Sequence, residues 1–143
     1  MSTIGVATLD HTVQETSVWL KAVQDGLALT NRQQAYNALR AVLHAVRDRL
    51  PPEVAVKFAA QLPILVRGIY YEGWHPAATP TRERHLEEFV EHVEGELPPA
   101  FPCKSLAAIR GVFETLWEKI DPGEFKKVMN HLPESIRDMR SSS

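Results

Sequence analysis

Two stretches of the chain share one pattern of prolines: RDRLPPEVAVKFAAQLPILVR, residues 47–67, and WEKIDPGEFKKVMNHLPESIR, residues 117–137. The second stretch begins 70 residues after the first, and both carry a proline at the same place near the start, Pro52 or Pro122, with a Leu-Pro pair that begins ten residues later. The residue before a proline avoids helical angles, whereas a proline is accepted in the first turn of a helix. Each stretch is therefore predicted to end one helix and begin the next at both places.

An internal repeat extends beyond these two stretches. Residues 36–70 align with residues 106–140 without a gap, and eight of the 35 positions are identical. The apolar positions have the spacing of one buried helical face in both halves, with Leu39, Val42, Leu43, Val46 and Leu50 falling on Ile109, Val112, Phe113, Leu116 and Ile120. We interpret the chain as two tandem copies, residues 1–75 and residues 76–143.

Local signals divide the first copy into about four helices. Thr12-x-x-Glu15 and Thr30-x-x-Gln33 are capping boxes, in which side chains satisfy the free amides of a helix start. The first box precedes an apolar stripe of Val13, Thr16, Trp19, Leu20 and Val23, and Asp25-Gly26 follows it as a stop signal. A third helix is predicted to start at Pro51 or Pro52, and a fourth is predicted to run from Pro63 to about Tyr71.

The second copy is predicted to contain four helices as well. Thr79-Pro80 reads as a helix start, another helix is expected to begin near Pro102, and Asp121-Pro122-Gly123-Glu124 combines a cap with a first-turn proline. No segment has the alternation typical of a strand. Because isolated short helices are marginal in water, we expect an all-α, compact helical bundle of two pseudo-symmetric repeats that cover each other's apolar faces.

The composition is that of an ordinary soluble protein. The 143 residues are 44% apolar and 24% charged, with a formal charge of −2. This charge argues against a dedicated nucleic-acid binder, which is usually basic. The single cysteine, Cys103, excludes an intramolecular disulfide. The sequence shows no secretory signal and no membrane-length apolar run, so we expect a cytoplasmic protein without membrane contact.

Charge is unevenly distributed along the chain. Residues 27–72 carry six basic and three acidic side chains, whereas residues 73–101 carry two basic and six acidic ones. We favour docking of the basic half on the acidic helix, within one molecule or between two. A weak nucleic-acid regulator acting through Arg40 and Arg47 is the alternative, although it calls for a denser patch.

Motifs for catalysis or cofactor binding are missing. His85, Glu88 and His92 share one helix face and could bind a metal, but the chain has no HExxH motif and no cysteine cluster. It also lacks a G-x-S-x-G elbow and a glycine-rich phosphate loop. We therefore assign no catalytic residue, no metal and no cofactor. Cys103 is interpreted as a structural thiol, although a nearby helix start can lower a thiol pKa.

Three aromatic rings gather in Tyr70-Tyr71-Glu72-Gly73-Trp74-His75. Tyrosine and tryptophan dominate protein-binding hot spots, and the cluster has no counterpart in the second copy. The candidate binding residues are Arg67, Tyr70, Tyr71, Trp74 and His75. The alternative is that Trp74 anchors the linker and closes the core. The recurring arginines at 40/110 and 67/137 are expected to hold helix ends or carboxylates.

The stretch LRAVLHAVRDRLPPEVAVKFAAQLPILVRGIYYEGW, residues 39–74, resembles the bacterial domain-of-unknown-function family number 2267. The resemblance implies a small all-α bacterial protein and brings no catalytic residues. Our first functional hypothesis is a non-enzymatic protein-interaction or accessory module with an unidentified protein partner, which includes a homodimer. A small-ligand or metal-binding, enzyme-like module is the second, and the nucleic-acid regulator is the third.

Overall fold

The computed structural model describes residues 4–139, and all regular structure in this range is helical. The ends of the two predicted copies, residues 1–3 and 140–143, lie outside the described residues. The elements are α1 Ala7–Gly26, α2 Arg32–Arg49, α3 Pro52–Ala59, α4 Ile64–Tyr71, the 3-10 turn η1 Pro76–Ala78, α5 Leu86–Glu96, α6 Ser105–Lys119, α7 Pro122–Met129 and α8 Glu134–Arg137. The all-α prediction is confirmed.

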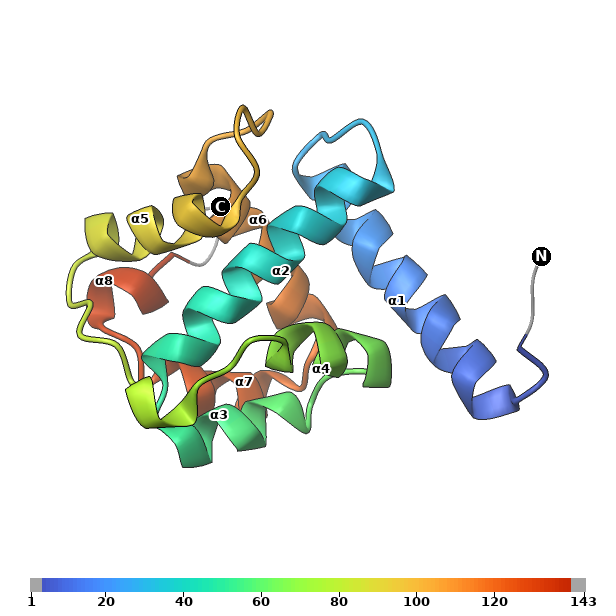
Figure 1. Cartoon of the computed structure of the whole chain (residues 1–143), viewed down its shortest axis with the longest axis horizontal. Helices are drawn as coiled ribbons and strands as arrows, with labels where there is room; N and C mark the ends of the chain where they lie inside the picture. The colour runs from blue at the N-terminus through green and yellow to red at the C-terminus, as the bar shows by residue number, and fades with distance from the viewer. Residues whose placement is uncertain (1–3, 140–143) are drawn as a thin grey trace.

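Helix α2 runs through the middle of the molecule, and most of the other helices pack around it (Figure 1). Ten of its 18 residues are buried, among them the charged side chain of Arg47 and the ring of His44. A helix that is buried nearly all round belongs to the interior of a bundle. α1, α4, α5 and α6 all contact α2, and α1 also packs on α6.

The proline signals place the short helices as predicted. α3 and α7 each have eight residues, and they begin at Pro52 and Pro122. Asp121 caps α7 by accepting a hydrogen bond from the N–H of Glu124 at 3.1 Å. Pro63 and Pro133 separate α4 and α8 from the preceding helices. α3 and α7 lie against each other at one side of the molecule (Figure 1).

The start of α1 differs from the prediction. α1 begins at Ala7, so Thr12 lies inside the helix and does not cap it. Its Oγ1 instead accepts a hydrogen bond from the backbone N–H of Leu65 in α4, at 3.3 Å. Val13, which was assigned to the buried stripe, is 44% exposed, whereas Trp19 and Val23 are buried. The added turns carry the helix beyond the body of the bundle.

Two other helix starts are shifted. Asn31, and not Thr30, caps α2 by accepting the N–H of Gln34 at 2.9 Å. Thr79-Pro80 does not begin a helix: residues 79–85 continue without regular structure until α5 starts at Leu86. The backbone N–H of Thr81 donates to the carbonyl of Asp48 at 2.8 Å, which holds this segment against the end of α2. No helix among residues 4–139 is long and apolar enough to span a bilayer.

Candidate functional site

The aromatic cluster after α4 is built mainly as a helix end. Tyr70 is fully buried, its hydroxyl donates to the carbonyl of Ala55 at 2.7 Å, and its ring meets Phe58 edge-on at 5.3 Å. Burial raises the pKa of the Tyr70 hydroxyl far above its usual range. The prediction that Tyr70 contributes to a binding surface is therefore wrong, because its ring is part of the core.

Side chains from α2 hold the carboxyl end of α4. A helix leaves its last carbonyls without intrahelical partners. His44 lies 2.7 Å from the carbonyl of Ile69 through Nε2, and Arg47 donates from Nη1 to the carbonyls of Tyr70 and Glu72, both at 2.8 Å. In the second half the positions of His44 and Arg47 are occupied by Glu114 and Trp117. The two α2 side chains that hold this helix end are therefore not repeated in α6.

The other candidate residues lie around this helix end. Tyr71 and Trp74 are half-buried and stack at 5.4 Å, and the Trp74 Nε1 is buried without an acceptor among the described residues. His75 is exposed. The contact of Tyr71, Trp74 and His75 with a partner stays a prediction.

Arg67 closes the end of α3. It donates from Nε to the carbonyl of Ala59 at 3.0 Å and from Nη2 to the carbonyl of Leu62 at 2.9 Å. Arg137 bonds the carbonyl of Leu132 in the same manner, at 3.4 Å. These bonds confirm for Arg67 and Arg137 the predicted role of the recurring arginines at helix ends.

The basic half docks on the acidic helix, as predicted. Arg40 pairs with Glu72 at 2.8 Å and with Glu96 of α5 at 3.3 Å. Glu96 also lies 3.2 Å from Nδ1 of His44. Since Arg47 and Arg67 bind backbone carbonyls, most of the basic side chains of this half are engaged within the chain.

A second ionic group joins α2 to α5. The His92 ring lies between Glu83, 2.8 Å from Nδ1, and Asp48, 3.5 Å from Nε2. The hydrogen bonds to Asp48 and then to Glu83 raise the pKa of His92 to about 9. Burial alone would raise the pKa of Asp48, but the bonds from His92 and Arg47 outweigh it and lower that pKa. His92 is therefore an imidazolium at neutral pH.

The His85, Glu88 and His92 face does not converge on one point. Glu88 accepts the backbone N–H groups of Arg84 and His85 at the start of α5, and His92 is held by carboxylates. Among residues 4–139 no three His, Cys, Asp or Glu side chains are arranged to hold a metal ion. Cys103 is half-buried against the core, and this burial raises the pKa of its thiol.

Exposed large apolar side chains occur in the N-terminal turns of both α1 and α4, and these two helices are in contact. We define the α1–α4 face as Leu9, Val13, Ile64 and Leu65, which are 38% to 47% exposed; Ile4 and Val6, which precede α1 in the chain, are 61% and 49% exposed. The N–H of Ile4 donates to Asp10 at 2.6 Å, which holds residues 4–6 against the first turns of α1. The sequence did not predict this face, because Val13 has the spacing of the apolar stripe of its helix and was therefore expected to be buried.

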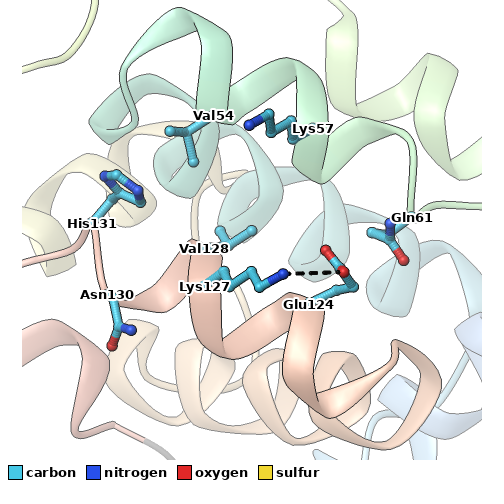
Figure 2. A pocket seen from close by; sticks show the side chains of 8 residues that line it. All are labelled: Val54, Lys57, Gln61, Glu124, Lys127, Val128, Asn130 and His131. Atoms are coloured by element: carbon cyan, nitrogen blue, oxygen red, sulfur yellow. Dashed lines mark ion pairs between the residues drawn. The ribbon is translucent and has the colours of Figure 1, made fainter.

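A groove lies between the antiparallel helices α3 and α7 (Figure 2). Its cavity volume is about 360 Å³. Figure 2 shows Val54 of α3 opposite His131, and Gln61 opposite Glu124 of α7. The remaining lining residues are Lys57, Lys127, Val128 and Asn130. Lysines at the equivalent positions 57 and 127 of the internal repeat are the sequence feature associated with this groove.

The fold and these surfaces define a small all-helical protein of eight α-helices in the described range, built around an apolar core and with ionic contacts between α2 and α5. The chain belongs to the family of uncharacterized conserved proteins DUF2267, whose model matches residues 16–139. The resemblance noted in the sequence is thus confirmed. No curated protein matches the chain in a sequence comparison.

Proposed function

We propose that this protein is a non-enzymatic protein-interaction module that pairs with a second copy of itself through the α1–α4 face. The observation that carries the proposal is the position of the exposed apolar side chains. Of the eight large apolar residues exposed among residues 4–139, six belong to the α1–α4 face and the adjoining residues 4–6. Exposed apolar groups gathered in one patch mark interaction sites, whereas scattered ones need no explanation.

The length of α1 supports this proposal. α1 has 20 residues, whereas α5, which ends 70 residues after α1 and so occupies the equivalent place in the repeat, has 11. The first turns of α1 extend past the bundle beside α4 (Figure 1). Within the chain these turns are therefore only partly covered, and a partner is needed to bury their apolar side chains.

The size of the face favours a symmetric pair. The exposed fractions of its four side chains, together with those of Ile4 and Val6, correspond to a patch of several hundred Å². Two such patches facing each other would bury on the order of 1,000 Å², which is near the lower limit for a specific interface. A twofold dimer brings one patch against its copy. We expect a dimer of about micromolar affinity rather than a permanent one.

Sedimentation velocity tests the proposal. The wild-type chain is expected to show a concentration-dependent monomer–dimer equilibrium. Val13→Glu places a charge in the face and is expected to leave a monomer, because an unpaired charge is costly to bury. The matched control is Val18→Glu, which makes the same change on the same helix at a position 53% exposed and outside the face.

The result has clear alternatives. A wild-type chain that stays monomeric at high micromolar concentration contradicts the proposal, as does a Val13→Glu variant that still dimerises. Circular dichroism of both variants checks that they remain helical. Equal loss of dimer in both variants would place the interface elsewhere on α1.

We also propose that the two halves are related by an internal twofold axis. Three observations support it: α3 and α7 have equal length and lie together, α1 packs on α6 as α5 packs on α2, and Arg67 and Arg137 bond the carbonyls of Leu62 and Leu132. An experimental structure tests this relation. Residues 36–69 are expected to superimpose helix by helix on residues 106–139, and different helix directions in the two segments would contradict it.

A further inference from the structure

The α3–α7 groove contains one lysine, Lys57, that forms no ion pair with any described residue, and a second, Lys127, that pairs with Glu124. Lys57 and Lys127 stand at aligned positions of the two halves, one on each helix. Figure 2 shows each lysine extending back along its own helix, Lys127 toward Glu124 and Lys57 toward Val54. The two side chains thus adopt matching arrangements on opposite sides of the groove.

The two lysines differ in their neighbours. Lys127 has a carboxylate three residues earlier, Glu124, at 3.5 Å. In α3 the residue three positions before Lys57 is Val54, which carries no charge. The Nζ of Lys57 forms no ion pair within 4.0 Å with any described residue. The two lysines and Glu124 leave the groove with an excess of one positive charge, which favours binding of an anion.

The rest of the lining suits a small molecule with an anionic and an apolar part. Gln61 and Asn130 carry amide donors, and His131 adds a ring nitrogen at the far end of the groove. Val54 and Val128 provide apolar walls. The volume of about 360 Å³ lies within the range of small-molecule sites, and it exceeds what a bare inorganic anion fills.

We propose that the α3–α7 groove binds a small organic phosphate, with the phosphate between Lys57 and Lys127 and the organic part against Val54 and Val128. Lysine binds phosphate as a point charge. Two lysines match a phosphate monoester, which carries about −1.5 to −2 charges at neutral pH. This site is separate from the α1–α4 face, and dimerisation is not required for it.

A titration of the full-length, ¹⁵N-labelled chain with phenyl phosphate tests the proposal by NMR. Saturable shifts are expected for amides of α3 and α7. Benzoate carries the same ring with one charge, and we expect it to bind about tenfold more weakly. Lys57→Gln and Lys127→Gln should each weaken phenyl phosphate binding about tenfold. Lys126→Gln is the matched control, because it removes the same charge from α7 outside the groove.

Three outcomes would overturn the proposal: shifts that do not saturate, equal affinity for phenyl phosphate and benzoate, or an equal loss of binding in Lys126→Gln. The first means that the groove holds no such ligand. The second means that the groove contacts only the apolar ring of the ligand. The third means that binding depends on the net charge of the protein and not on the groove. The lysines are on the surface, so the variants are expected to keep the wild-type amide spectrum, which confirms their folding.

Discussion

The backbone N–H of Leu65 donates to Oγ1 of Thr12, 3.3 Å away, and this bond joins the first turn of α4 to the side of α1. Pro63 precedes α4 and has no side chain that can cap the helix. A hydroxyl from α1 therefore satisfies one of the free amides of α4. This bond fixes the first turn of α4 against α1, and these two helices carry Leu9, Val13, Ile64 and Leu65.

Loss of the Thr12 hydroxyl should destabilise the protein. Thr12 is only 2% exposed, so Thr12→Val leaves the N–H of Leu65 without a partner. We expect a loss of about 1 kcal/mol in the free energy of unfolding, measured by urea denaturation. Thr12→Ser retains the hydroxyl and should lose less. Equal effects of both changes would contradict a role for the hydrogen bond.

Arg47 should be the most sensitive charged position. Its buried guanidinium binds Asp48 and the carbonyls of Tyr70 and Glu72. Arg47→Met leaves the carbonyls of Tyr70 and Glu72 without this donor and removes one of the two cations beside Asp48, and we expect it to cost about 3 kcal/mol of unfolding free energy. Arg82→Met, at an exposed position, should change stability little. A small effect at Arg47 would contradict the account of the α4 end.

His92 should make stability depend on pH above neutrality. Its folded pKa of about 9 lies above the ordinary value of 6.5. The stability it contributes is complete below the unfolded pKa and is lost as the pH rises through the folded one. Between about pH 6 and pH 9.5, the free energy of unfolding of the wild type should fall by about 2 to 3 kcal/mol relative to that of His92→Gln. Urea denaturation of both proteins across this pH range checks the prediction. A difference in unfolding free energy that does not change with pH would contradict it.

Gly111 should be required for the contact between α1 and α6. A Cβ there would stand 2.5 Å from Cδ2 and 2.8 Å from Cγ of Leu27, the residue after α1. Gly111→Ala is therefore expected to lower the free energy of unfolding by about 1 to 3 kcal/mol. Gly95→Ala, in α5, meets no atom within 4 Å and should stabilise by about 0.5 kcal/mol. Thermal unfolding of both variants distinguishes the two cases, and stabilisation at both positions would contradict the close approach.

Local chemistry explains how much of the fold the sequence could predict. The prolines at 52, 63, 122 and 133 act on their own helices, so the boundaries they set were correct. The start of α1 was wrong because the hydroxyl of Thr12 bonds Leu65, 53 residues away. A capping pattern is local, and it does not show which distant amide will take the hydroxyl.

The candidate site was harder to predict for the same reason. Tyr70 is in the core because His44 and Arg47 hold the end of α4, and this contact exists only after α2 and α4 have packed. Whether Val13 is buried depends on how far the neighbouring helices extend. An ion pair between the two segments, such as that of Arg40 with Glu96, could be predicted without its exact partners. Basic side chains predominate in residues 27–72 and acidic ones in residues 73–101.

Isotope-filtered NOE spectroscopy on a mixture of ¹³C-labelled and unlabelled chains tests the central claim most directly, because it detects only contacts between copies. The account predicts NOEs between copies that involve the methyl groups of Leu9, Val13, Ile64 and Leu65. NOEs between copies from Val18 or Val56 alone, or none at concentrations where the chain sediments as a dimer, would contradict it.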